Sequence, residues 1–260
     1  MRLGGFGLIK DYDAIRDAGF DYAELDMPEI EALNERDFGR FRDSVEEKAF
    51  PVSIGARLLP IQEPTFFVDG FDETSLESYI RSSCKKSSAL GIKTIIFGNG
   101  KARWLIDEDS LKRERVFINF LRMLCIIAGE NAQEVLIEPL GPKYSNYINT
   151  LPEAARIIQE AAMPNLFTMA DLRHLVWSKE SFEDMTQYRN IIHHVHIDYP
   201  LSFPERKYPS LRDDYDYAPF LERLRDYNGT LTVEADIPTD WVAAGKDARA
   251  LISAYGKALA

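Results

Sequence analysis

Four polar side chains of types that bind metal ions follow short apolar runs rich in β-branched residues. They are Glu138, Asp171, His196 and Glu234, at the carboxyl-side ends of runs 135–139, 166–171, 191–198 and 231–235. The intervals between them are 33, 25 and 38 positions, each about one strand–helix unit. Parallel strands at this spacing bring distant residues to one mouth of a barrel. Three carboxylates and an imidazole meeting there would form an oxygen-rich site for a hard or borderline divalent cation.

The chain as a whole alternates strand and helix patterns, with a strand first in each unit. We expect strands over residues 2–9, 21–27, 51–58, 93–98, 134–139, 165–171, 191–198 and 229–235. We expect helices over residues 11–20, 35–50, 73–91, 108–129, 150–162 (with Thr150 as N-cap), 178–189, 214–227 and from 239 onward. Eight such units predict an α/β fold of the (β/α)8 type, a TIM barrel, with its active site at the carboxyl ends of the strands. The length fits a single domain over residues 1–260.

Composition and charge exclude several classes of partner. The net charge of −11, from 42 acidic and 31 basic residues, repels a phosphate backbone and argues against a nucleic-acid partner. No apolar run approaches 18 residues, and residues 1–10 lack the form of a signal peptide, so we expect no membrane partner and a cytoplasmic location. Cys84 and Cys125 are expected to be reduced and buried. A homo-oligomer is compatible with this composition.

Strand alternation distinguishes the three histidines of run 191–198. His194 and His196 share one face of the strand, while His193 points to the other. We assign His196 to the metal site, His194 to a deeper layer of the barrel and His193 to packing against helices. The alternative for Asp171 is a helix N-cap.

Other polar and aromatic residues have both a structural and a functional interpretation, and both stay open. Glu24, near the end of the second strand, reaches the substrate or bonds a buried neighbour. Trp104 and Trp177 wall a sugar pocket or simply pack. Arg103 contributes to the site or, as we favour, braces the loop after the fourth strand through carboxylate pairs. Segment 59–72, with two prolines and three phenylalanines, forms a lid over substrate or an apolar cluster under a loop.

Seven short segments, in this order, resemble the xylose isomerase-like superfamily of TIM barrels. They are IFGNGKAR (96–103), IEP (137–139), DLRH (171–174), HVHI (194–197), RKYP (206–209), DDYDYAPFL (213–221) and LTVEA (231–235). This superfamily comprises the sugar isomerase and epimerase group and shares its barrel with the family 2 AP endonucleases. The resemblance spans most of the chain and implies the barrel fold.

The resemblance also implies roles for particular residues. It implies one divalent metal ion, commonly manganese, magnesium or cobalt, with zinc also considered and manganese favoured. The implied ligands are Glu138, Asp171, His196 and Glu234. Glu138 and Glu234 would double as the catalytic proton-transferring pair. His174 and Arg206 would hold substrate oxygens, although the long segment 201–205 bears on whether Arg206 reaches the site. We expect no aromatic or histidine side chain from the first strand at the substrate.

These expectations favour a metal-dependent isomerase or epimerase of a small sugar or related polyol-derived keto compound. Removing a carbon-bound proton leaves an enediolate that a metal stabilises, and two glutamates can move the proton. A dehydratase of an inosose- or dehydroshikimate-like substrate is the alternative, and a non-catalytic ligand-binding homologue is a third. AP endonuclease chemistry is disfavoured because four histidines cannot supply its histidine-rich zinc cluster. The absence of a glycine-rich phosphate cradle after the seventh or eighth predicted strand favours an unphosphorylated carbohydrate.

Overall fold

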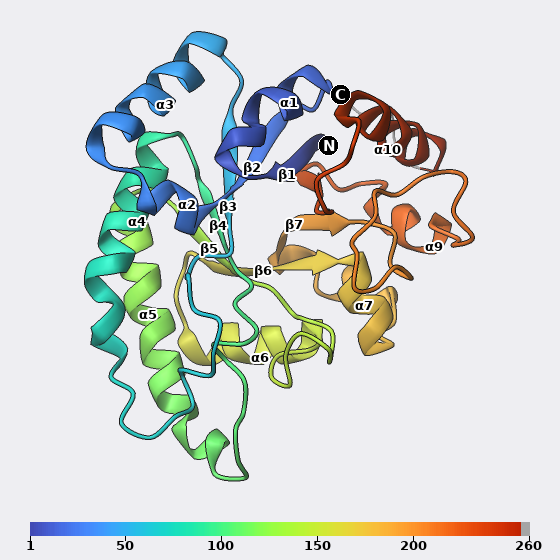
Figure 1. The fold of residues 1–260 in the computed structure, drawn as a ribbon. Coiled ribbons are helices and arrows are strands. Elements are labelled where there is room, and N and C mark those ends of the chain that lie inside the picture. The colour runs from blue at the N-terminus through green and yellow to red at the C-terminus, as the bar shows by residue number, and fades with distance from the viewer. Residues whose placement is uncertain (256–260) are drawn as a thin grey trace.

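Eight parallel strands form one closed barrel in the computed structural model, which describes residues 1–255 (Figure 1). Each strand pairs with its neighbours in sequence, and β1 pairs with β8 to close the ring. The strands are β1 Arg2–Gly7, β2 Tyr22–Asp26, β3 Val52–Ala56, β4 Thr94–Phe97, β5 Glu134–Ile137, β6 Leu166–Asp171, β7 Ile192–Ile197 and β8 Thr230–Val233. Every strand lies within its predicted range, so the predicted (β/α)8 barrel is confirmed.

Inside the barrel, an apolar layer lies directly beneath a polar one. The apolar layer is a packed cluster of Tyr22, Ile54, Ile96, Leu136 and Met169. Because successive inward-facing residues of a strand are two positions apart, the next inward residues on three of these strands are Glu24, Glu138 and Asp171. On these strands, an apolar core residue and an acidic residue of the site are therefore only two positions apart.

Helices cover the outside of the barrel (Figure 1). They are α1 Tyr12–Asp17, α2 Met27–Ala32, α3 Glu35–Lys48, α4 Glu77–Ala89, α5 Glu114–Glu130, α6 Leu151–Ala161, α7 Leu172–Ser178, α8 Glu183–Gln187, α9 Ala218–Leu221 and α10 Trp241–Tyr255. Short 3-10 turns lie at Ile9–Asp11, Glu73–Leu76, Ser110–Arg113, Arg189–Ile191 and Glu222–Leu224. None of the helices within residues 1–255 has the length and apolarity needed to cross a bilayer.

The helices differ from the prediction in four respects. The helix predicted over 178–189 is wrong in extent, because the structure has only α8 there, between the end of α7 and a 3-10 turn. The sequence patterns did not predict α2 or α7, which follow β2 and β6 directly and begin at the N-caps Asp26 and Asp171. At six and seven residues, these helices are too short to produce a clear periodic signal. The helix predicted over 214–227 is wrong in extent, because only α9 and the turn after it are helical there. Any part of the last predicted helix beyond residue 255 lies outside the described residues.

The segment at 59–72 is held to the barrel by its phenylalanines. Phe66 and Phe67 are fully buried, and the Phe66 ring centroid lies 4.6 Å from that of Phe120 on α5. The apolar-cluster interpretation therefore holds for these two residues. Cys84 and Cys125 are buried free thiols on α4 and α5, as predicted.

The predicted N-cap of α6 is confirmed and provides a test of the fold. The backbone N–H of Glu153 donates to Thr150 Oγ1 at 3.3 Å, and the Glu153 carboxylate accepts from the Thr150 N–H at 3.2 Å. We expect Thr150→Ala to lower the free energy of unfolding by about 1 kcal/mol in urea titrations, because it leaves a helix N–H without its acceptor. Thr150→Ser keeps the hydroxyl and is the matched control. Equal stability of the alanine and serine variants would contradict the role of this cap.

Candidate functional site

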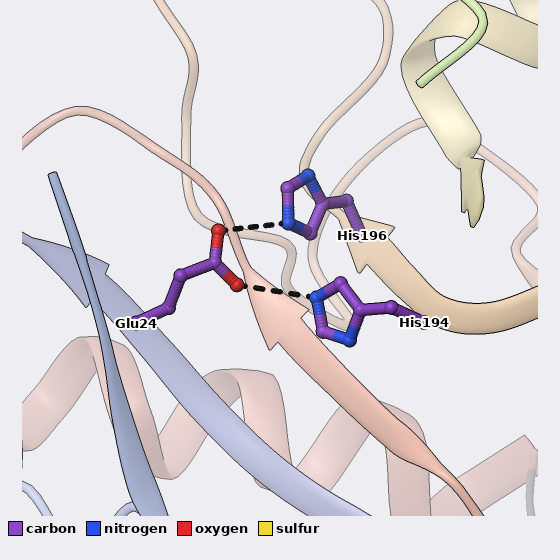
Figure 2. Close-up of side chains that lie close together, drawn as sticks. All are labelled: Glu24, His194 and His196. Atoms are coloured by element: carbon purple, nitrogen blue, oxygen red, sulfur yellow. Dashed lines mark hydrogen bonds and ion pairs between the residues drawn. The ribbon is translucent and has the colours of Figure 1, made fainter. Parts of the chain in front are cut away.

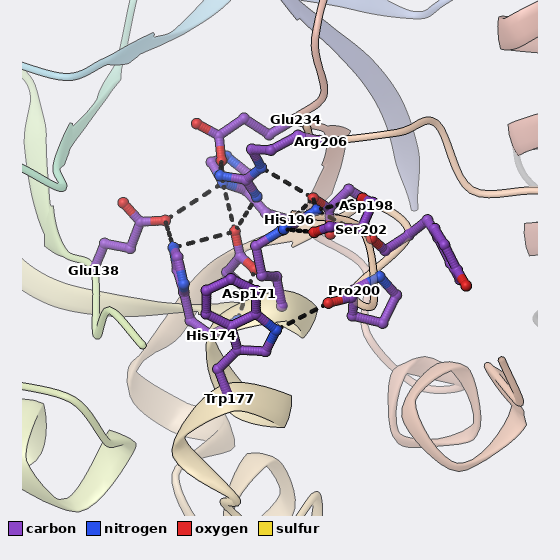
Figure 3. Close-up of polar contacts among 12 residues, drawn as sticks. Glu138, Asp171, His174, Trp177, His196, Asp198, Pro200, Ser202, Arg206 and Glu234 are labelled. Atoms are coloured by element: carbon purple, nitrogen blue, oxygen red, sulfur yellow. Dashed lines mark hydrogen bonds and ion pairs between the residues drawn. The ribbon is translucent and has the colours of Figure 1, made fainter. Parts of the chain in front are cut away.

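Four side chains of metal-binding type converge at the mouth of the barrel (Figure 3). They are the residues singled out from the sequence, Glu138, Asp171, His196 and Glu234, and one ligand atom of each lies within 4.8 Å of the others. Atoms that share one metal ion at about 2.0–2.6 Å have separations of this size. Glu138 Oε1 and His196 Nδ1 are buried 3.6 Å apart, and neither has a hydrogen-bond partner in the described chain. Since buried polar atoms without partners are costly, a cation between them fits this arrangement.

A further buried carboxylate orients His196 (Figure 2). Glu24 accepts hydrogen bonds from Nε2 of His196 at 3.0 Å and Nε2 of His194 at 3.1 Å, and all three side chains are buried. Because Glu24 engages Nε2, His196 Nδ1 is the nitrogen that faces the three carboxylates, 3.2 to 3.6 Å away. Glu24 thus bonds buried neighbours. His194 lies in the deeper layer, as predicted, and its Nδ1 contacts Thr230 Oγ1 at 2.7 Å.

The third histidine of β7 lies on the outer face, as the alternation predicts. We predicted packing against helices, and its aromatic and polar contacts are with residues of other strands. The ring of His193 stacks on Phe167 of β6, and its Nδ1 lies 2.8 Å from Oε2 of Glu134 on β5.

Asp171 has both of the roles considered for it, one for each carboxylate oxygen. Oδ1 accepts a hydrogen bond from the backbone N–H of His174 at 3.2 Å, which caps α7. Oδ2 faces His196 Nδ1 at 3.6 Å and accepts from Arg206 Nη2 at 2.8 Å. The helix start therefore fixes the direction of the oxygen that points into the cluster.

Arg206 reaches the centre of the site despite the long segment before it (Figure 3). Its Nε donates to Asp198 Oδ2 at 3.0 Å, and its Nη1 forms an ion pair with Glu234. Asp198 also accepts from Arg173 Nε at 2.6 Å, and both of these side chains are fully buried. The sequence interpretation missed Arg173 and Asp198. Asp198 could have been recognised, because it follows His196 by two positions and so continues the inward face of β7.

The pKa values of the cluster are set by burial and by the neighbouring charges. Burial raises the pKa of Glu138 to about 7, with a contribution from the negative charge of Glu234. Burial acts in the same sense on Glu234, but Arg206 and His196 hold its pKa below the ordinary value. Burial opposes the charged form of His196, yet the carboxylates of Glu24 and Glu234 raise its pKa well above the usual range. Nδ1 of His196 can therefore carry a proton that a metal ion would replace.

A cavity of about 440 Å³ opens above the cluster. Its walls include three residues proposed from sequence as substrate contacts, His174, Arg206 and Trp104. Phe6 of β1 also lines it, so the expectation that the first strand offers no aromatic side chain was wrong. Phe6 pairs with Glu24 of β2 across the sheet, and the side chains of both residues point into the barrel.

His174 lies between the cluster and the open cavity. Its Nε2 is 3.7 Å from Glu138 Oε1 and 3.8 Å from Asp171 Oδ2. Its buried Nδ1 has no hydrogen-bond partner in residues 1–255. Burial lowers the pKa of His174 to about 4, so the ring is neutral near pH 7 and can hydrogen-bond a ligand oxygen without adding charge.

Trp177 stands behind the wall of the cavity. It stacks on Tyr144, which lines the cavity, with ring centroids 5.6 Å apart, and its Nε1 donates to the carbonyl of Pro200 at 2.9 Å. The packing interpretation therefore describes its observed contacts.

Two residues next to β4 shape the position of Glu138. Arg103 is fully buried and donates to the backbone carbonyls of Glu138 and Phe97. The predicted bracing role is confirmed, but its hydrogen bonds are to backbone carbonyls and not to carboxylates. At Gly98, a Cβ atom would lie 2.0 Å from Glu138 Oε2, so a side chain there would displace the carboxylate.

Comparisons with known proteins agree with this fold. No curated protein matches the chain. Among solved structures, 3-keto-D-glucoside 4-epimerase from E. coli is 20% identical, covers 98% of this chain and 99% of its own, and has a TM-score of 0.78. D-psicose 3-epimerase is 16% identical, covers 97% of each chain, and has a TM-score of 0.79. The probable 3-DHS dehydratase from Bacillus anthracis is 15% identical, covers 96% and 98%, and has a TM-score of 0.74.

Identities this low show only that the folds are alike. Membership of a family is shown instead by a family model that matches the sequence. The model described as xylose isomerase-like TIM barrel matches residues 12–254, nearly the whole chain. This chain belongs to the xylose isomerase-like TIM barrel family.

Proposed function

We propose that this protein is a divalent-metal-dependent epimerase or isomerase of a small sugar or related keto compound. The observation that carries the proposal is the set of inward ligand atoms at the floor of the cavity, two of them buried without partners. Glu138, Asp171, His196 and Glu234 would hold the metal, with manganese favoured over magnesium, cobalt and zinc. The four ligand types suit a cation that binds oxygen and imidazole. When bound, the ion would act as a Lewis acid that stabilises negative charge developing on substrate oxygens.

Glu138 and Glu234 are suited to move a proton between the two faces of a substrate carbon. They follow β5 and β8, which lie on opposing arcs of the barrel, and both line the cavity. One glutamate, as a carboxylate, would remove a proton from the carbon next to a carbonyl, leaving an enediolate. The other, in its protonated form, would donate a different proton to the opposite face. Burial raises the pKa of Glu138 to about 7 when no cation is bound, and a bound cation would lower it and favour the carboxylate form that acts as a base.

His174 and Arg206 are proposed to orient the substrate. His174 presents a neutral ring to the cavity beside Glu138, and Arg206 presents a guanidinium beside Glu234. Both lie outside the set of four proposed ligands and can bind hydroxyl or carbonyl oxygens. Trp104 adds an apolar surface to the same cavity.

The decisive experiment follows solvent deuterium into a panel of ketoses, inososes and hydroxy-keto acids with manganese present. Deuterium entering at the carbon next to the carbonyl, without loss of water, supports the epimerase or isomerase. Elimination of water supports a dehydratase, which needs the same first proton transfer. Metal-dependent binding with neither reaction would indicate a non-catalytic homologue.

Metal binding should be visible in stability as well as activity. Chelation should abolish deuterium exchange and lower the melting temperature, and manganese should restore both, because a cation bound only by the folded state stabilises it by about 2.7 kcal/mol at 100 times Kd. The double variant Glu138→Gln/Asp171→Asn is the control and should show no manganese-induced shift. Full exchange activity after exhaustive chelation would reject the mechanism.

The two glutamates should be individually necessary. We expect Glu138→Gln and Glu234→Gln to fold but to lose 10²–10⁴-fold in kcat, because each loses a base and a charged ligand. Glu108→Gln, at an exposed position outside the cavity lining, controls for a general change of charge. Near-normal kcat in either site variant would remove that residue from the catalytic pair.

Glu24 should control metal affinity from outside the ligand set. Glu24→Gln replaces one acceptor by a donor, so one of its two histidines must change tautomer, and we expect manganese affinity to fall 10–100-fold in calorimetric titrations. The matched control is Glu134→Gln, which alters a similar carboxylate–histidine pair on the outer face, where Glu134 Oε2 lies 2.8 Å from His193 Nδ1. Equal manganese affinity in the two variants would show that Glu24 does not act through His196.

A further inference from the structure

We infer that the ligand of this cavity is an anionic sugar or keto compound, with a carboxylate or phosphate at the end remote from the metal cluster. The inference rests on the proposed function for the position of the reacting carbons. It goes beyond that function by naming the chemical class of the substrate. It is carried by the charges around the cavity mouth.

Cationic side chains from three successive loops line one side of the cavity. Arg57 follows β3, Lys101 follows β4, and Lys143 follows β5. Among the described residues that line the cavity, Asp236 is the one acidic residue outside the four-residue cluster. Its carboxylate accepts a hydrogen bond from the backbone N–H of Arg206 at 2.9 Å. A local excess of positive charge is unexpected in a chain with a net charge of −11. The positive charge of this side of the cavity mouth therefore differs from the mostly acidic surface of the protein.

Within residues 1–255, neither lysine has an ion-pair partner. No carboxylate oxygen of residues 1–255 lies within 4.0 Å of the Lys101 or Lys143 ammonium, whereas Arg57 is paired with Asp26 at 2.9 Å. The Lys143 ammonium lies 4.1 Å from the ring centroid of Trp177 and 4.0 Å from that of Phe203. These cation–π contacts hold the Lys143 ammonium beside two rings that stand next to the cavity lining and leave its hydrogen-bonding capacity free.

The loops that carry the two lysines are packed together. A Cβ atom at Gly100 would lie 2.4 Å from the backbone oxygen of Tyr144, so the residues next to Lys101 and Lys143 are in direct contact. Trp177 stacks on Tyr144 from behind and supports this part of the rim. Lys101 and Lys143 therefore extend from two loops that are packed against each other, and both line the cavity.

The four-residue cluster and the two lysines, Lys101 and Lys143, would bind opposite ends of one ligand. A neutral sugar would leave two ammonium groups without a counter-charge, while an anionic group can form charge-assisted hydrogen bonds with them. Positive charge at a concave mouth also concentrates anions before they bind. A cavity of about 440 Å³ has room for a monosaccharide that carries such a group.

The test compares ligands that differ only at the remote carbon. The probes are the four D-2-ketohexoses (fructose, tagatose, sorbose and psicose), their C6 carboxylates and their C6 phosphates, titrated into the manganese-loaded protein by calorimetry. At least one carboxylate or phosphate should bind tenfold or more tightly than its neutral counterpart, with affinity that falls as salt rises. The two acidic arms distinguish a sugar acid from a sugar phosphate.

Substitutions of Lys101 and Lys143 test whether these two lysines cause the preference for acidic ligands. Lys101→Gln and Lys143→Gln should each lower affinity for the preferred acidic ligand at least fivefold and leave that for its neutral counterpart unchanged. Lys85→Gln, at an exposed position on α4 outside the cavity lining, is the matched control. The inference is overturned if no acidic probe binds tenfold more tightly than its neutral form, or if neither the Lys101 nor the Lys143 variant changes the preference.

This test is separable from that of the proposed function. Metal-dependent deuterium exchange into neutral ketoses, with no preference for acidic probes, would leave the proposed function standing and remove the anionic ligand. Selective binding of an acidic probe through the two lysines, with no deuterium exchange into any probe, would support the ligand class and remove the isomerase or epimerase.

Discussion

Negative charge buried at the mouth of the barrel is the constraint on which the rest of the site depends. Glu24, Glu138, Asp171 and Asp198 are buried there, and Glu234 is only 14% exposed at its side chain. Carboxylates in such a place are tolerated when cations or hydrogen-bond donors face them. Buried arginines and histidines face most of these oxygens, and the remaining positions converge on one point. The same concentration of charge that would destabilise an ordinary core makes this core a candidate cation site.

Strand β7 organises this charge because its inward residues alternate strictly. His194 and His196 of β7 and Asp198 directly after it point to the barrel interior at successive levels. Both histidines donate to Glu24, and Asp198 accepts from Arg206. Glu24 joins the two lower levels across the barrel, from a strand 170 residues away in sequence. Small displacements of β7 would therefore change the direction of His196 Nδ1 and the position of Arg206 together. The rigid barrel gives both groups a fixed geometry.

The candidate site has two parts that differ in structure and chemistry. Its floor is built from strand ends and contains the ligand-type residues, whose arrangement suits proton transfer next to a carbonyl. Its rim is built from loops, including Lys101 and Lys143, whose chemistry suits recognition of a particular ligand end. Loops vary more readily than strands in a shared fold, so structural likeness at 14–20% identity conveys the barrel without conveying the substrate.

The sequence alone determined the strand order, the barrel and the four converging residues, because strand alternation and the strand–helix period are local properties visible in one chain. It could not place Glu24, whose partners are fixed by closure of the ring, or decide between the two roles of Asp171, which the structure shows to be compatible. It missed Arg173, Asp198 and the contacts of the Lys143 ammonium with the rings of Trp177 and Phe203. These contacts join helix α7 to loops, and no local pattern in the sequence encodes their relative positions. Tertiary packing decided them, because only the folded barrel fixes where each loop meets its neighbour.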